Sequence, residues 1–224
     1  MLKAVLFDLD NTLLPMNEEE FIKVYFSLVC KKLAPLGFEP KKLVKTIWGG
    51  TYQMISNDGK RSNSKVFWTY FENVYGINKE DYEPIFDDFY KNEFKETRVT
   101  CRDNPYSRDI IKILKDKGLK IILISNPIYP KQAYVTRMAF AGFKEEDFDY
   151  IATYDNSSYS KPNPKFIEEV LAKNNLKKDE VIVIGNSFEN DIEPAQKLGI
   201  KTYLVGEESK VTIEEMIQKL HVLH

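Results

Sequence analysis

Histidine and cysteine are both scarce in this sequence of 224 residues. The two histidines, His221 and His224, lie in the last four positions, beyond the last predicted strand. Histidine is therefore not expected as the catalytic base, which leaves carboxylates and lysines for proton transfer. The two cysteines, Cys30 and Cys101, form no CxxC pair, so neither a disulfide framework nor a four-cysteine zinc site is expected. We expect both thiols to be buried as small hydrophobic side chains.

Long apolar runs and a strong charge imbalance are missing as well. No stretch approaches the length of a membrane span, and the first apolar run, 4–7, ends at Asp8, unlike the core of a signal peptide. We therefore expect a cytoplasmic protein with no membrane partner. The net charge is −2, with 43% hydrophobic and 29% charged residues, so the chain has a globular composition and no general attraction to nucleic acid. The sequence leaves the oligomeric state open.

Short apolar runs alternate with helical segments in most of the chain. Buried strands are predicted at 4–7, 119–124, 150–153, 181–184 and 202–205. Helices are predicted near 106–117, 131–142, 164–174 and 190–198. This alternation predicts a Rossmann-like, doubly wound α/β fold, with helices on both faces of a parallel sheet.

The interval between the first two predicted strands is about a hundred residues, far longer than a crossover needs. Its aromatic residues recur at helical spacing, as at Phe21, Tyr25 and Leu28, which predicts an inserted all-helical domain. We place this cap domain at 15–102 and the catalytic core at 1–14 and 103–224. The polar stretch 57–64 is expected to be an exposed loop.

Polar residues follow several of the predicted strands. Asp8 and Asp10 follow the first strand and point the same way, so a nearby cation would explain why their repulsion is tolerated. Ser125 and Asn126 follow the second strand. In a doubly wound sheet, ligands bind outside the carboxyl ends of the strands. Residues from separate segments are therefore expected to converge at one edge, the later ones being Lys161, Asn186 and Asp191.

The segments DLDNT, ISN, KPNP and GNSFENDIEPA, in this order, resemble the four signature motifs of the haloacid dehalogenase superfamily. The insert is similar in position and helical character to a C1-type cap of that family. The resemblance implies a phosphatase in which Asp8 attacks phosphorus and forms an aspartyl phosphate. It implies that Asp10 protonates the leaving oxygen and later deprotonates water, chemistry that suits carboxylates at this spacing.

The resemblance also implies a Mg²⁺ cofactor and a phosphate pocket. The implied metal ligands are the Asp8 side chain, the Asp10 carbonyl, Asn186 and Asp191, and an all-oxygen site suits this ion. The implied phosphate-binding residues are Thr12, Ser125, Asn126 and Lys161. The substrate would be a small phosphorylated metabolite.

The fourth motif departs from the commonest family pattern, because Asn186 stands where an acid is usual. Loss of one negative charge predicts weaker metal binding. Asp191 is then expected either to contact the ion or to orient its waters and Lys161. Glu189 is a less favoured substitute for the missing acid.

Three alternatives to a phosphatase are compatible with parts of this pattern. A dehalogenase is disfavoured, because in the family pattern the dehalogenases lack an acid at the position of Asp10. A phosphomutase and a weakly active phosphate-binding regulatory module stay open, the second because of Asn186. Candidate cap contacts to substrate are 48–52 and 60–61, although Trp48 and Tyr52 fit the core of the helical domain equally well.

Overall fold

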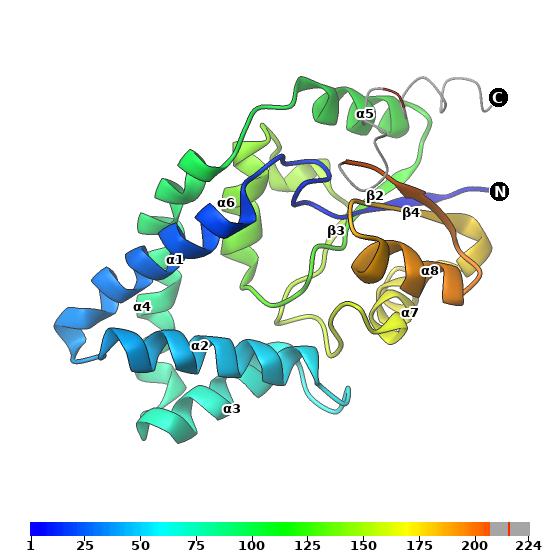
Figure 1. Ribbon diagram of the computed structural model, residues 1–224. Helices are drawn as coiled ribbons and strands as arrows, with labels where there is room; N and C mark the ends of the chain where they lie inside the picture. Colours follow the sequence, from blue (N-terminus) through cyan, green and yellow to red (C-terminus); the bar gives the residue numbers. More distant parts are fainter. Residues whose placement is uncertain (207–214, 216–224) are drawn as a thin grey trace.

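A five-stranded parallel sheet forms the centre of the larger part of the molecule, as the computed structural model shows (Figure 1). The structure describes residues 1–206 and residue 215, so His221, His224 and the predicted core boundary at residue 224 lie outside the described residues. The strand order is β3-β2-β1-β4-β5. The strands are β1 (Ala4–Phe7), β2 (Lys120–Leu123), β3 (Tyr150–Ile151), β4 (Val181–Gly185) and β5 (Lys201–Leu204).

Helices cover both faces of the sheet, which confirms the predicted doubly wound fold. They are α5 (Pro105–Asp116), α6 (Lys131–Phe140), α7 (Pro164–Lys173) and α8 (Glu193–Lys197). Alternate residues of β1 point to opposite faces: Val5 packs in one apolar cluster with α5 and α6, and Leu6 in another with α7 and α8. Burial on both faces explains why the strands have continuous apolar sequences.

Two predicted elements differ from the observed ones. The third strand ends at Ile151 because the Asn156 side chain bonds to the backbone beyond it, accepting from Thr153 N at 2.7 Å and donating to Ile151 O at 2.9 Å. The helix expected at 190–198 is a π-helical turn, Phe188–Ile192, followed by the short α8. Pro194 lies in the first turn of α8, where its missing N–H is tolerated.

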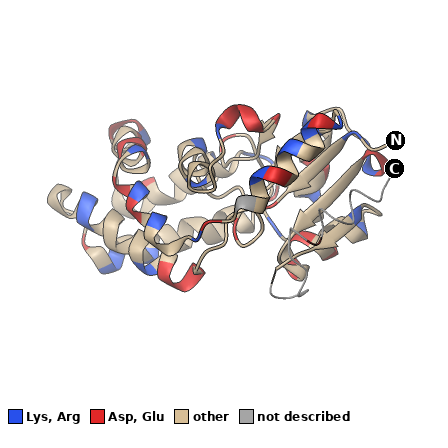
Figure 2. Ribbon diagram, turned by 90° about the horizontal axis from the view of Figure 1, so that it is seen from above, with Lys and Arg blue, Asp and Glu red and all other residues tan. Residues whose placement is uncertain are grey.

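The segment between β1 and α5 is helical throughout most of its length, as predicted. It contains α1 (Glu18–Leu33), α2 (Pro40–Ile55), α3 (Asn63–Tyr75) and α4 (Lys79–Lys91), followed by a 3-10 segment, η2 (Glu93–Thr100). These helices lie to one side of the sheet in Figure 1, with α6 between the two parts. Their shared core is rich in aromatic rings, including Tyr25, Phe71 and Phe89. Figure 2 shows basic and acidic residues interspersed along these helices.

The glycine pair of α2 serves helix packing. A Cβ atom on Gly50 would lie 2.6 Å from the Phe67 ring, and one on Gly49 would lie 2.4 Å from the Tyr70 hydroxyl. Both aromatic residues belong to α3. Both glycines lie in 48–52, one of the predicted cap contacts to substrate, and the close contact of α2 with α3 is a separate structural reason for them.

The chain enters and leaves the helical part along two adjacent segments. Met16 and Cys101 form an antiparallel bridge, and Arg102 N donates to Pro15 O at 2.8 Å. We keep 15–102 as the proposed extent of the cap domain, and this pairing supports it. Cys30 and Cys101 are both partly exposed, so the prediction of buried thiols is wrong. Cys101 lies in the crossing segment, where it packs at the edge of a core cluster.

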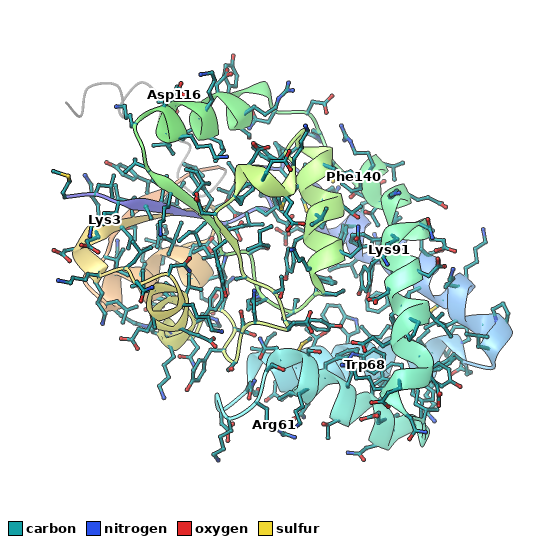
Figure 3. All side chains as sticks on the ribbon, turned by 180° about the vertical axis from the view of Figure 1, so that it is seen from behind. Lys3, Arg61, Trp68, Lys91, Asp116 and Phe140 are labelled. Atoms are coloured by element: carbon teal, nitrogen blue, oxygen red, sulfur yellow. The ribbon has the colours of Figure 1, made fainter. Side chains whose placement is uncertain are left out.

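The loop predicted to be exposed is buried at both ends. Asn57 is 9% exposed and Asn63 is fully buried. Asn63 Nδ2 donates to Pro127 O at 3.0 Å and to Ser160 Oγ at 2.9 Å, which attaches the loop to the core beside Lys161. Figure 3 labels Arg61 within this loop. No helix among the described residues is long and apolar enough to cross a membrane, and the predicted cytoplasmic location stays a prediction.

Candidate active site

Asp8 lies directly beyond β1, at the edge of the sheet where the parallel strands end. Its backbone N–H donates to Ile184 O at 2.9 Å, which extends the pairing of β1 with β4 by one residue. The residue is only 6% exposed. Because the carboxyl ends of β1, β2 and β4 meet at this edge, residues from distant parts of the chain surround Asp8.

Lys161 binds two carboxylates at once. Its Nζ lies 2.7 Å from Asp8 Oδ1 and 2.5 Å from Asp191 Oδ1. Burial lowers the pKa of Lys161, but Asp191 and Asp8 outweigh that effect and hold the pKa above its ordinary value. Burial, together with the neighbouring Asp191 and Asp10, raises the pKa of Asp8 to about 7 against the lowering effect of Lys161. The lysine is therefore a fixed cation at the centre of the site.

Thr12 connects Asp8 with the fourth motif. Its hydroxyl donates to Asp8 Oδ2 at 3.1 Å, and it also lies within hydrogen-bond distance of Asn186 Oδ1, at 3.3 Å. The tight turn that brings Thr12 back includes Asn11 with a positive φ of 55°, a conformation that asparagine tolerates better than most residues. Oxygens of Asp8 and Asn186 therefore converge on one point.

Asp191 is fixed on both of its carboxylate oxygens. Oδ1 binds Lys161, and Oδ2 accepts from Ser187 N at 3.0 Å. A Cβ atom on Gly185 would lie 2.3 Å from this carboxyl group, so glycine is required for the close approach. Asp191 therefore contacts Lys161 directly, and its predicted roles toward the lysine and the ion stay predictions. Glu189 is exposed.

Ser125 and Asn126 follow β2 at the same edge. Ser125 is 5% exposed. Asn126 Oδ1 accepts from Lys161 N at 3.1 Å, and Asn126 O accepts from Tyr134 Oη at 2.5 Å. The asparagine therefore holds the backbone of the lysine segment in place. The structure thus brings all the predicted site residues to one edge of the sheet, while their roles stay predictions.

Arg137 is a buried cation that the sequence reasoning missed. It lies on α6, is 2% exposed and forms an ion pair with Asp10 Oδ1. Its Nη2 also lies 3.1 Å from Met16 Sδ, and its guanidinium stacks over Phe21 at 4.7 Å from the ring centroid. The sequence signal that could have identified Arg137 is its position beside apolar residues of a predicted helix. Tyr134 and Met138 of α6 are fully buried, so an arginine next to them is expected to be buried as well.

The ionic side chains of the site carry one more negative charge than positive charges. Asp8, Asp10 and Asp191 supply three carboxylates, whereas Lys161 and Arg137 supply two cations. The oxygens that lie near the Thr12 hydroxyl belong to a carboxylate and an amide, which are suitable ligands for Mg²⁺. This ion usually keeps several waters and needs only one or two carboxylates. No cluster of three or more His, Cys, Asp or Glu side chains suited to a metal occurs among the described residues. The oxygens of Asp8 and Asn186 are donors that would suit Mg²⁺, and the predicted set of metal ligands stays a prediction.

A cavity of about 270 Å³ adjoins the site and extends between the sheet edge and the helical part. Asp10, Ser125 and Asn126 line it from the core side. Of the predicted cap contacts, Trp48 and Thr51 line the cavity. Tyr52 does not and is 66% exposed, and Lys60 pairs with Asp58 in the loop before α3. Trp48 is 48% exposed, so it is not core of the helical domain.

Comparisons with known proteins agree with this geometry. Residues 5–205 match the family model for haloacid dehalogenase-like hydrolases. The chain is 25% identical over 242 residues to a glyceraldehyde 3-phosphate phosphatase of Methanothermobacter thermautotrophicus, covering 98% of this chain and 92% of the relative.

Two solved structures resemble the fold. A HAD phosphatase from Thermococcus onnurineus has a TM-score of 0.61 and 19% identity, with 98% of each chain covered. A HAD-family enzyme from Bacteroides thetaiotaomicron, in complex with magnesium and inorganic phosphate, has a TM-score of 0.54 and 20% identity, with 92% of this chain and 94% of that chain covered. The predicted Rossmann-like core with a helical insert is confirmed, and the chain belongs to the family of haloacid dehalogenase-like hydrolases.

Proposed function

We propose that this protein is a Mg²⁺-dependent phosphoric monoester hydrolase that acts through an aspartyl phosphate on Asp8. The observation that carries the proposal is the environment of this carboxylate. Lys161 binds one of its oxygens, Thr12 binds the other, and a second carboxylate follows two residues later. A buried carboxylate beside donors for phosphoryl oxygens suits nucleophilic attack on phosphorus.

In the first half of the reaction, an Asp8 oxygen attacks phosphorus. A new O–P bond forms as the bond between phosphorus and the substrate alcohol breaks, and protonated Asp10 gives its proton to the departing oxygen. The Lys161 ammonium and the hydroxyls of Thr12 and Ser125 supply donors to phosphoryl oxygens. Their fixed positions at the sheet edge reduce reorganisation during the step.

In the second half, water attacks phosphorus of the aspartyl phosphate. Asp10 accepts a proton from that water, the bond to Asp8 breaks, and inorganic phosphate leaves. Both halves require the Asp10 carboxyl to face the reacting oxygen. Arg137 engages Oδ1 of this carboxyl and leaves Oδ2 outside the ion pair, so we infer that the arginine is a positioning residue for Asp10.

Bound Mg²⁺ would reduce the repulsion between the Asp8 carboxylate and the anionic phosphoryl group. The extra negative charge of the site supports the proposal of a cation there. The magnesium and phosphate complex of the Bacteroides enzyme supports it as well. Asn186 contributes an amide oxygen where an acid would add charge, so we expect modest affinity for the ion.

The substrate is proposed to be a small phosphorylated metabolite. Support comes from the glyceraldehyde 3-phosphate phosphatase among the relatives, and from a cavity of about 270 Å³, near the lower limit of ordinary ligand sites.

The test is release of inorganic phosphate from a panel of phosphate esters, with and without EDTA. Wild type should need Mg²⁺, and Asp8→Asn should have no turnover, whereas Asp116→Asn, an exposed change on α5, should behave as wild type. Equal turnover by Asp8→Asn would contradict the proposal. Conversion of a sugar 1-phosphate to the 6-phosphate without free phosphate would instead show a phosphomutase. Tight phosphate binding with no turnover on any ester would favour the regulatory module.

A further inference from the structure

The cavity beside the site is lined mainly by apolar and aromatic side chains. From the Asp10 side it meets α1, α2, α3, α4 and the segment before α6, and its wall includes Phe21, Tyr25, Phe26, Trp48, Trp68 and Tyr129. Figure 3 labels Trp68 on α3, in the helical part. An ester whose phosphate lies at Asp8 would place its alcohol half in this space, because Asp10, Ser125 and Asn126 belong to both regions.

We propose that the alcohol half of the substrate is an apolar group, of the size of an aromatic ring or larger, with no second anionic group. The inference rests on the proposed function, because it names the substrate class of that same site. It separates this protein from phosphatases for bisphosphates, phosphorylated acids and polar sugar esters.

The charge of the cavity wall excludes a second anion. Among the described residues that line the cavity, Arg137 is the one lysine or arginine, and an anion bound to it would compete with Asp10, its partner in the site. Glu18 adds a further carboxylate. A second phosphate or a carboxylate in this space would lose its hydration without gaining a free cation, which is strongly unfavourable.

One pair of polar groups in the wall is unavailable to a polyol. The hydroxyls of Tyr25 and Tyr90 lie 3.0 Å apart and bond to each other, so this pair is already satisfied. Burial raises the pKa of both tyrosines above its ordinary value, so both remain neutral donors or acceptors. Hydroxyl groups that enter an apolar cavity without partners lose hydration, whereas an apolar ring there gains buried area and edge or face contacts with the aromatic wall.

The cavity opens toward solvent at half-exposed apolar side chains. Trp48 is 48% exposed and Ile22 is 39% exposed, and both line the cavity. A longer apolar alcohol can therefore extend past them while its phosphate stays at Asp8. This arrangement also makes Trp48 a suitable site for a variant, because a half-exposed side chain contributes less to folding than a buried one.

The direct test uses three primary alkyl phosphates with similar leaving groups: ethyl phosphate, 2-phenylethyl phosphate and 2-carboxyethyl phosphate. We expect kcat/KM for the phenyl ester to exceed that of ethyl phosphate by about tenfold or more, and the carboxylate ester to be the poorest of the three. Trp48→Ala should bring the ratio of phenyl to ethyl ester closer to one. Ile55→Ala, an exposed change on the same helix outside the cavity, should keep the wild-type ratio.

Binding separates this inference from the proposed function. Calorimetry with Mg²⁺ should show 2-phenylethylphosphonate binding about tenfold more tightly than ethylphosphonate, whether or not any ester is hydrolysed. That preference without turnover would refute the hydrolase and support the apolar site. Turnover of all three esters, with 2-carboxyethyl phosphate or glyceraldehyde 3-phosphate matching or exceeding the phenyl ester, would overturn the apolar site and keep the hydrolase.

Discussion

Removal of the Asp8 charge should stabilise the metal-free protein at alkaline pH. Asp8 is 6% exposed and belongs to a group of five ionic side chains with one negative charge left over. Asp8→Asn keeps the size and one oxygen of the side chain and removes that charge. The variant should therefore lose its activity and gain stability, a combination opposite to the usual effect of changing a buried polar residue.

The magnitude follows from the pKa of Asp8, which rises from 3.8 to about 7 with burial as the largest cause. A difference of about 3 pKa units corresponds to about 4 kcal/mol of unfolding free energy. Because the pKa is higher in the folded state, the stabilising contribution is complete below pH 3.8 and is lost as the pH rises through about 7. Relative to Asp8→Asn, wild type should lose stability over this window and change little above it.

Urea denaturation in EDTA, at several pH values from 4 to 9, measures this difference, with Asp116→Asn as a control for an exposed carboxylate. Addition of Mg²⁺ at pH 8.5 should stabilise wild type more than Asp8→Asn, because the ion binds the folded state and supplies the missing charge. A variant less stable than wild type at pH 8.5 in EDTA, or a difference that does not change with pH, would refute the reasoning.

Three further changes test other parts of the site. Arg137→Met should lower kcat about tenfold to a hundredfold, because it frees the Asp10 side chain, and Arg137→Lys should recover part of the loss. An unchanged pH profile of kcat in both variants would contradict the positioning role. Asn186→Asp should tighten Mg²⁺ binding about tenfold in calorimetry, and unchanged affinity would remove Asn186 from the ion's surroundings. Asn63→Ala should lower the free energy of unfolding, measured in urea, by about 1 to 3 kcal/mol, because it leaves polar groups of the core loops unpaired. Asn190→Ala, at an exposed position, should lower the free energy of unfolding by less.

Much of the sheet could be predicted because its signals are local. The apolar runs at β1, β2 and β4 are buried on both faces, and each is followed by polar residues at the same sheet edge. The short β3 was overestimated, since the run looks apolar to Thr153 while the Asn156 side chain captures the backbone. A competing side-chain hydrogen bond of this kind has no periodic signature.

The parts of the site that the sequence did not reveal depend on long-range contacts. Arg137 is 127 positions from Asp10, and nothing local to α6 identifies its partner. Asn63 lies in a polar stretch that is typical of an exposed loop, yet the core segment before Lys161 buries it. By contrast, the positions of Asp8, Lys161 and Asp191 after predicted strands indicated that they would meet at one sheet edge, and the resemblance to the family motifs added Thr12.

The central claim is that Asp8 carries the phosphoryl group during turnover. Rapid quenching of the reaction with 2-phenylethyl phosphate, followed by mass spectrometry of the peptide that contains Asp8, tests this claim directly. The account predicts one added phosphoryl group on Asp8 in Mg²⁺, with no adduct in EDTA or in Asp8→Asn. Ester hydrolysis by Asp8→Asn, or a phosphoryl group on another residue of the wild type, would contradict it.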